Sequence, residues 1–126
     1  TIINTPNAPA PIGPYNQAVL TGNLLFISGQ VCIDPPTGNL KNGSIEEETT
    51  QVMENLKAIL TEAGLDFSHV VKTTIFITDM NQFSTINGIY GKYFQTAFPA
   101  RETVQVSALP KMVNVEISMI AIKNQG

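Results

Sequence analysis

The chain has 126 residues, 43% of them hydrophobic and 13% charged, and 7 basic against 10 acidic residues give it a formal net charge of -3. This length and composition fit one folded domain over residues 1–126 and exclude a disordered chain. The sequence has no basic cluster and no apolar run near the roughly 20 residues that cross a membrane, so neither nucleic acid nor a membrane is an expected partner.

The cysteine content and the N-terminus point to a cytoplasmic protein. The one cysteine, Cys32, excludes a disulfide within the chain and favours a reducing compartment. The first residues lack the charged start and apolar run of a signal peptide, although a chain that has lost a transit peptide would look the same. The low charged fraction leaves few groups to cover the surface with polar atoms, which is a first indication of a buried subunit interface.

The first part of the chain predicts an irregular segment and a β-hairpin. Four prolines before Tyr15 favour extended, irregular backbone. Two β-prone runs follow, at residues 17–20 and 24–31. Gly22 and Asn23 lie between them as a two-residue hairpin turn. The second run begins with apolar residues on both of its faces, so we expect this strand to be covered on both sides.

Two helices and three further strands complete the predicted order. Ser44 and Glu47 form a capping box at the start of the first helix, and Gly64 supplies its stop. Gly88 and Gly91 lower the helix propensity of the second helix. The expected helices cover residues 44–63 and 82–97, and the expected strands cover residues 70–77, 102–106 and 113–122.

The order ββαβαββ predicts an α+β fold with a mixed sheet and two helices on one face. Parallel strands joined through a helix take a right-handed crossover, which brings the helices to the same side. Two helices can cover only one face of such a sheet. Since several strands are apolar on both faces, we expect the second face to pack against another subunit.

The last two strands contain the residues best suited to chemistry. Side chains alternate between the faces of a strand. If these strands pair as an antiparallel hairpin, Thr103 lies opposite Glu116. Arg101 then lies near Ser118, so an arginine and a glutamate share one polar face. Cross-strand partners on a wet face are the simpler interpretation, and a catalytic role gains weight only if a subunit covers this face.

Other residues have simple structural interpretations. His69 lies in a turn and Cys32 follows an apolar strand, so a solvated histidine and a small buried hydrophobe are favoured over a catalytic base and a reactive thiol. One histidine and one cysteine are too few for a zinc site, so no metal is expected. Ser28 and Gly29 interrupt the second strand, which indicates either an ordinary bulge or the close approach of a ligand. Tyr15 is either a packed aromatic or part of such a site.

Several short segments occur in an order and spacing that are specific together, although each is weak alone. They are residues 10–18 (APIGPYNQA), 26–30 (FISGQ), 99–101 (PAR) and 113–117 (VNVEI), with Asn87 and residues 90–94 (YGKYF). With these segments the chain resembles the Rid family, the reactive intermediate imine/enamine deaminases, also called YjgF-like. The resemblance covers essentially the whole length.

The resemblance implies a homotrimer of chorismate-mutase-like architecture with sites between subunits. It implies a hydrolytic, cofactor-free deaminase that converts 2-iminobutanoate and 2-iminopropanoate to 2-keto acids and ammonia. By this resemblance, the family's carboxylate-binding arginine corresponds to Arg101, and its glutamate that takes part in the chemistry corresponds to Glu116. The other residues that the resemblance brings to the substrate are Tyr15, Ser28, Gly29, Glu102 and Thr103.

This chain departs from the family pattern directly after the arginine. The best-known members have Ser-Cys there, whereas this chain has Glu102 and Thr103. The family contacts at these positions use backbone atoms, so we expect activity to survive and substrate preference to change. Two other functions stay open: a non-catalytic trimer that binds small carboxylates, and a ribonuclease or translation inhibitor, which the acidic charge disfavours. A chorismate mutase would share only the fold.

Overall fold

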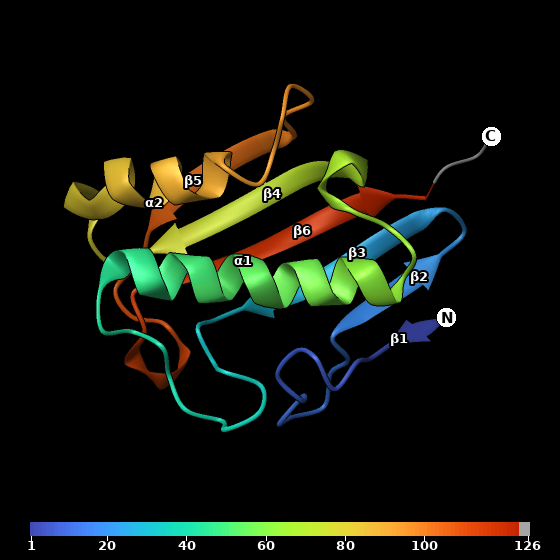
Figure 1. Ribbon diagram of the computed structural model, residues 1–126, viewed down its shortest axis with the longest axis horizontal. Coiled ribbons are helices and arrows are strands. Elements are labelled where there is room, and N and C mark those ends of the chain that lie inside the picture. The colour runs from blue at the N-terminus through green and yellow to red at the C-terminus, as the bar shows by residue number, and fades with distance from the viewer. Residues whose placement is uncertain (124–126) are drawn as a thin grey trace.

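A mixed, six-stranded sheet forms the centre of the protein in the computed structural model, which describes residues 1–123 (Figure 1). The strands lie in the order β1-β2-β3-β6-β4-β5. Their bounds are Ile2–Ile3 (β1), Ala18–Thr21 (β2), Leu24–Gln30 (β3), Val70–Ile77 (β4), Ala100–Gln105 (β5) and Val115–Ile122 (β6). The helices are α1 (Ile45–Glu62) and α2 (Phe83–Gly91), with 3-10 turns η1 (Phe67–His69), η2 (Met80–Gln82) and η3 (Pro110–Met112).

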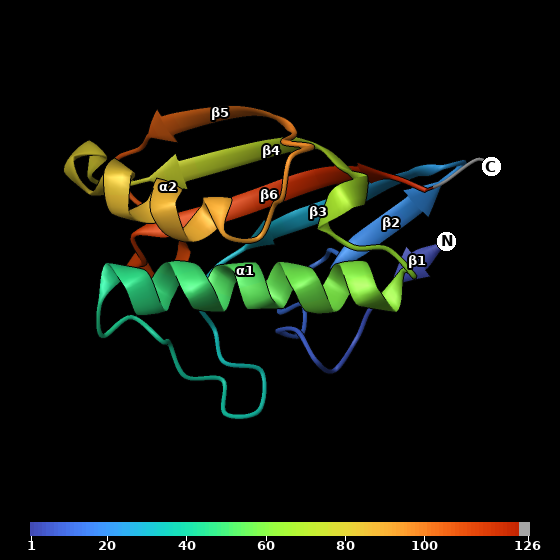
Figure 2. The ribbon, with the colours of Figure 1, turned by 45° about the horizontal axis from the view of Figure 1, so that its top comes forward.

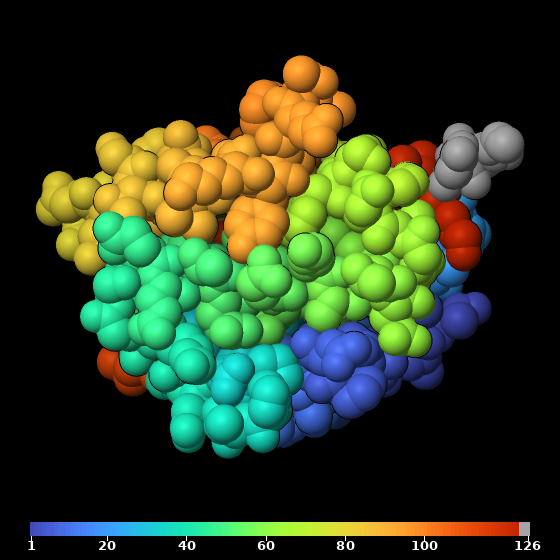
Figure 3. All heavy atoms as spheres, in the orientation of Figure 1, coloured from blue at the N-terminus to red at the C-terminus, as the bar shows by residue number. Residues whose placement is uncertain are grey.

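Both helices lie on the same side of the sheet, as Figure 2 shows, which confirms the expected α+β architecture. The apolar stripe of α1 is fully buried against the strand residues that point toward it. This core includes Val52, Leu56, Ile59 and Leu60 of α1 and Leu25, Ile75 and Ile117 of the sheet, all 0% exposed. In Figure 3 the atoms of α1 and of the segments on either side of it cover the middle of this face.

The ends of α1 agree with the sequence prediction to within one residue. Ser44 Oγ accepts a hydrogen bond from the Glu47 backbone N–H at 3.0 Å. The Glu47 carboxylate reaches back to the N–H of Gly43, at 2.8 Å, so only half of the expected capping box is present. Gly64 follows the helix with φ +78°, a left-handed conformation that favours glycine and stops the helix.

The predicted end of α2 is wrong, because the helix stops at Gly91 instead of residue 97. The residues after it turn inward and pack their rings on Phe67. The ring centroids of Tyr93 and Phe94 lie 5.3 and 5.4 Å from that of Phe67. A continued helix would carry these two rings in different directions, so the aromatic cluster ends the helix. The short edge strand β1 was not predicted.

The predicted hairpin between the last two strands is also wrong. β4 lies between them, parallel to β5 and antiparallel to β6. Val106 N–H donates to Ile77 O, and Thr78 N–H donates to Asn114 O, so the end of β4 is bonded on both sides. The connection from β5 to β6 is long enough to cross over the end of β4, and a central strand of β-branched residues gains two partners.

The sheet face opposite the helices is called the open face here, and it is apolar. Val19 of β2, Phe26 of β3 and Val104 of β5 point to this side and are 41%, 43% and 43% exposed. Phe26 lies beside Ile120 of β6 in the ladder. That this face packs against another subunit stays a prediction. Within residues 1–123, neither helix is long and apolar enough to span a membrane.

Candidate functional site

Four of the predicted site residues line one cavity of about 460 Å³ beside the N-terminal segment. They are Tyr15, Ser28, Gly29 and Glu116. Glu116 is the second residue of β6 and points to the open face, since its ladder neighbour Phe76 lies on that face. The remaining walls are mainly apolar, from the proline-rich segment, the end of β3 and the η3 turn.

Gly29 brings the β3 backbone against the Glu116 carboxylate. A Cβ atom added at Gly29 would lie 2.8 Å from Glu116 Cδ and 2.9 Å from Oε2. The pairing of β3 with β6 shifts register between Ile27 and Gln30, which identifies a β-bulge at this point. The expected bulge is confirmed, and the group that approaches Gly29 is the glutamate side chain instead of a ligand or another backbone.

The segment that contains Tyr15 is held to β3 and to itself by buried and partly buried hydrogen bonds. Ser28 Oγ donates to Asn16 O at 2.6 Å. The amide of Gln17, which is 1% exposed, accepts from Thr5 N–H at 2.6 Å and donates to Pro9 O at 2.8 Å. These bonds satisfy the polar backbone of an irregular segment and hold it as a wall of the cavity.

Glu116 is partly removed from water where it lines this cavity. Burial disfavours the charged form and raises the pKa of its carboxyl group. A carboxyl group with a raised pKa holds a proton at a higher pH than a free glutamate does, which suits a group that takes and returns a proton. Lys111 is the charged residue that lines the cavity with it.

Lys111 was not identified as a site residue from the sequence. It reaches the cavity because it and Met112 have φ values of 59° and 56°, in the left-handed region that non-glycine residues seldom occupy. No glycine or asparagine marks this turn, so no sequence pattern predicts the conformation. The one feature of the sequence that could have indicated a role for Lys111 in the site is its position between Pro110 and Val113, shortly before Glu116.

Arg101 lies on the helix-covered side of β5 and is held there by α2. Its ladder neighbour is Thr73, whose side chain is fully buried under the helices. The guanidinium Nη1 donates to Asn87 Oδ1 at 2.6 Å. Cζ lies 5.2 Å from the ring centroid of Tyr90 and 5.5 Å from that of Phe83. Two rings and an amide therefore orient the guanidinium, which stays exposed.

Arg101 and Glu116 do not share one face, so the predicted placement is wrong. Their ladder neighbours on β4 are Thr73 and Phe76, three residues apart and thus on opposite faces. Two strand spacings and three residues separate their Cα atoms by about 14 Å. The prediction failed because β4 lies between the two strands and shifts their alignment by one residue: through Phe76, Glu116 aligns with Val104 and not with Thr103.

Glu102 and Thr103 also point to different sides of β5. The Glu102 carboxylate lies on the open face, 3.3 Å from Lys72 Nζ and 3.4 Å from Thr74 Oγ1. It therefore points away from the Arg101 side chain. Thr103 Oγ1 is buried and has no hydrogen-bond partner in residues 1–123. A buried hydroxyl without a partner is uncommon in a folded protein.

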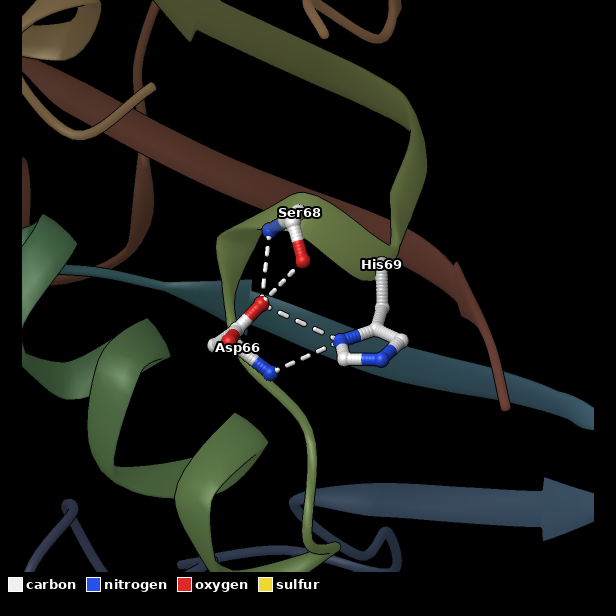
Figure 4. Close-up of polar contacts among 3 residues, drawn as sticks. All are labelled: Asp66, Ser68 and His69. Atoms are coloured by element: carbon white, nitrogen blue, oxygen red, sulfur yellow. Dashed lines mark hydrogen bonds and ion pairs between the residues drawn. The ribbon is translucent and has the colours of Figure 1, made fainter. Parts of the chain in front are cut away.

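The histidine is part of a turn, as predicted (Figure 4). Asp66 Oδ1 accepts hydrogen bonds from Ser68 N–H at 2.9 Å and from Ser68 Oγ, and lies 3.1 Å from His69 Nδ1. Asp66 N–H donates to the same ring nitrogen. The Ser68 hydroxyl bonds to the carboxylate and not to the imidazole, so the trio caps η1 and does not form a nucleophile–base pair. The hydrogen bonds from Ser68 lower the pKa of Asp66.

Cys32 is buried, as expected for a small hydrophobe. Burial, with a smaller contribution from the charge of Glu48, raises the pKa of its thiol to about 11. The thiol is therefore neutral near pH 7. Among residues 1–123, no three histidine, cysteine, aspartate or glutamate side chains gather as metal ligands.

A family model described as Endoribonuclease L-PSP matches residues 5–123. The chain belongs to this family, which is the Rid or YjgF-like family that its motifs resemble. A RutC family protein of Pyrococcus horikoshii is 52% identical over 122 residues, which cover 97% of this chain and 97% of that protein.

Two further relatives bear on function. The 2-iminobutanoate/2-iminopropanoate deaminase of Bos taurus is 51% identical over 122 residues, covering 97% of this chain and 89% of that protein. The crystal structure of E. coli TdcF with bound serine has a TM-score of 0.94 and 42% identity, covering 98% of this chain and 99% of that chain. The family thus includes relatives about half identical to this chain that carry the name of an imine deaminase.

Proposed function

We propose that the protein is a 2-iminobutanoate/2-iminopropanoate deaminase that acts as a homotrimer. The observation that carries this proposal is the division of the site within one chain. The cavity of Glu116 and the guanidinium of Arg101 lie on opposite faces of the sheet, so one small substrate reaches both only if they come from two copies.

The open face and the edge strand support this assembly. A sheet face with exposed Phe26 and Val104 costs free energy in water, and burial against a second copy removes that cost. Arg101 projects from β5, which is an edge strand, toward the outside of the subunit. A neighbouring copy that packs on the open face supplies its Tyr15, Ser28, Gly29 and Glu116 to this arginine.

The proposed reaction divides between binding and proton transfer. Arg101 binds the substrate carboxylate with two parallel hydrogen bonds, and charge-assisted bonds of this kind each contribute about 1.5–3 kcal/mol. The bound serine in E. coli TdcF is a small molecule of matching chemistry. The ring contacts of Arg101 hold the fork in one orientation before the substrate arrives.

Glu116 acts on the water. Its carboxylate takes a proton from the water as the water oxygen bonds to the imine carbon, and it passes this proton to the imine nitrogen to give a neutral tetrahedral carbinolamine. Glu116 then takes the proton of the carbinolamine hydroxyl group and transfers it to the amino nitrogen, so that the C–N bond breaks, ammonia leaves and the carbonyl of the 2-keto acid forms. General base catalysis of this kind contributes roughly 10²–10⁴-fold. No redox change occurs.

The residues Glu102 and Thr103, which replace the Ser-Cys of the best-known relatives after Arg101, affect the assembly more than the chemistry. Glu102 pairs with Lys72 on the open face, which is the face that we propose to be covered. The Thr103 hydroxyl is buried in residues 1–123, so Thr103 would meet the substrate through its backbone, as the family resemblance implies. These two positions are where substrate preference differs from that of relatives with Ser-Cys.

Mixing two inactive variants tests the proposal directly. Arg101→Ala and Glu116→Gln each lose imine hydrolysis when they assemble alone. In a 1:1 mixture that is unfolded and refolded together, a site is intact when Arg101 and Glu116 both come from unsubstituted positions. Random assembly of a cyclic trimer restores about one quarter of wild-type sites.

The readout is release of 2-keto acid from a freshly generated imine. The control is each variant refolded alone. A mixture as inactive as the two variants alone would show that sites do not form between copies. A wild-type protein that binds the small carboxylate without releasing product would instead support the non-catalytic trimer.

A further inference from the structure

A buried carboxylate beneath the start of β6 has no part in the proposed reaction. Glu48, in the first turn of α1, is 0% exposed. Its Oε2 accepts from the backbone N–H groups of Asn114 at 2.7 Å and Val115 at 3.0 Å, and its Oε1 accepts from Asn114 Nδ2 at 2.8 Å. We call this set of contacts the Glu48 clamp.

The clamp binds its carboxylate without an ion pair. In residues 1–123, no lysine or arginine lies within salt-bridge distance of Glu48. Three N–H donors and the positive end of the α1 dipole compensate its charge instead. A buried carboxylate is costly unless such donors satisfy it, so the geometry of the donors is tightly specified.

The two backbone donors are the residues directly before Glu116. Asn114 O also accepts from Thr78 N–H at 3.1 Å, so α1, the end of β4 and the start of β6 meet at this point. The clamp thereby fixes the backbone from which the Glu116 side chain leaves. Glu48 approaches from the helix-covered side, while Glu116 points to the open face.

Glu116 needs this restraint because its place in the cavity leaves little tolerance. A Cβ atom on residue 29 would lie only 2.8 Å from Glu116 Cδ, so the carboxylate packs directly against the backbone of Gly29. The bulge between Ile27 and Gln30 interrupts the β3 ladder beside it, so β3 restrains Glu116 less than a regular strand would. A small shift of the start of β6 therefore displaces the Glu116 carboxylate from its position in the cavity.

We propose that Glu48 is a positioning residue, which acts through the backbone N–H groups of Asn114 and Val115 to hold the Glu116 carboxylate against Gly29. The proposal rests on the proposed function for its kinetic consequence, because Glu116 is the base of that reaction. Its structural consequence, a change in the environment of the Glu116 carboxyl group, does not depend on that function.

The test compares three substitutions in the full-length protein. Glu48→Ala removes both acceptors, and Glu48→Gln keeps an oxygen for the two backbone donors but removes the charge. Leu60→Ala is the control, since Leu60 is also fully buried on α1 but belongs to the apolar core. The rates of Glu48→Ala and of the control are measured at the same number of degrees below the melting temperature of each variant. If Glu48→Ala does not fold, Glu48→Asp, one methylene too short to reach both donors, replaces it.

We expect kcat of Glu48→Ala to fall roughly 10-fold or more with KM within about 3-fold, because misplacing a reacting group by about 1 Å can cost on the order of 10²-fold in rate and Arg101 is untouched. Glu48→Gln and Leu60→Ala should retain most of kcat. A carbon-13 NMR titration of the Glu116 carboxyl group should show its pKa falling toward the ordinary value in Glu48→Ala, as the group leaves the cavity. The other titratable groups lining that cavity are Tyr15 and Lys111.

Two results would overturn the proposal. In the first, Glu48→Ala loses no more kcat than Leu60→Ala and leaves the Glu116 titration unchanged, so that Glu48 serves stability alone. In the second, Glu48→Gln is as impaired as Glu48→Ala, so that the charge and not the acceptor geometry matters. A wild-type protein without imine hydrolysis overturns the proposed function, and the Glu116 titration then decides this proposal by itself.

Discussion

Glu116 carries the most informative residue-scale prediction, because burial raises its pKa. As a base it works only when deprotonated, so kcat/KM should fall as the pH drops through this raised pKa. The acidic limb of the profile should therefore lie above 4.5, the ordinary pKa of a glutamate carboxyl group. A pH–rate profile checks this, and a limb at or below the ordinary glutamate range contradicts it.

The same raised pKa makes an opposite prediction for stability. A carboxyl group whose pKa is higher in the folded state stabilises the fold when protonated, fully so below the unfolded pKa. This stabilisation is lost as the pH rises through the folded pKa. Glu116→Gln, which removes the charge, should therefore raise the melting temperature at pH 8 and give no increase at pH 3. Thermal melts at both pH values measure the difference, and an equal gain at the two would contradict burial as its cause.

Arg101 permits an unusually clean chemical test, because it is the one arginine in a sequence with 7 lysine and arginine residues. Phenylglyoxal should modify one site per chain, and a small 2-keto acid should protect it. Arg101→Lys keeps the charge but loses the planar fork, so kcat/KM should fall by roughly 10- to 100-fold. The variant is expected to remain folded, since the Arg101 side chain is exposed.

At the scale of elements, the bulge in β3 is predicted to be intolerant of any side chain. Gly29→Ala places a methyl group 2.8 Å from Glu116 Cδ, which displaces the carboxylate. Activity should fall about as far as in Glu116→Gln. Gly88→Ala is the matched control, because nothing lies within 4 Å of its added Cβ. That substitution should stabilise α2 by about 0.5–1 kcal/mol and spare activity. Thermal melts and imine hydrolysis together check the pair.

The elements were largely predictable from the sequence, whereas their pairing was not. β4 matched its prediction at residues 70–77, and α1 did so within one residue, because caps and periodicity are local. The order β6-β4-β5 depends on a crossover between residues distant in sequence, which no local pattern encodes. The end of α2 likewise depends on Phe67, far from it in the chain.

The residues of the candidate site likewise fall into those that the local sequence predicts and those whose placement depends on strand pairing. Gly29 was predictable, since a glycine inside a strand has few structural explanations. The placement of Arg101 relative to Glu116 was not, because it required the position of β4. Lys111 escaped prediction because its left-handed backbone is set by the crossing loop and not by its residue type.

At the scale of the whole molecule, the open face should decide both assembly and activity. Phe26→Glu puts a charge on this face and should yield monomers without imine hydrolysis. Met80→Glu is the matched control, because Met80 is equally exposed, at 43%, but lies in η2 beyond the end of β4. Sedimentation gives the oligomeric state of each. Active monomers of Phe26→Glu would show that each chain holds a complete site.

The contact between Gly29 and Glu116 also has an evolutionary consequence. A mutation that gives position 29 a side chain is harmful while a glutamate occupies position 116, but becomes tolerable once a shorter residue has replaced it. Lineages that abandon the glutamate should therefore lose the glycine afterwards and not before. Descendants with a substituted position 29 can be recognised from their genes alone as having given up the ancestral chemistry.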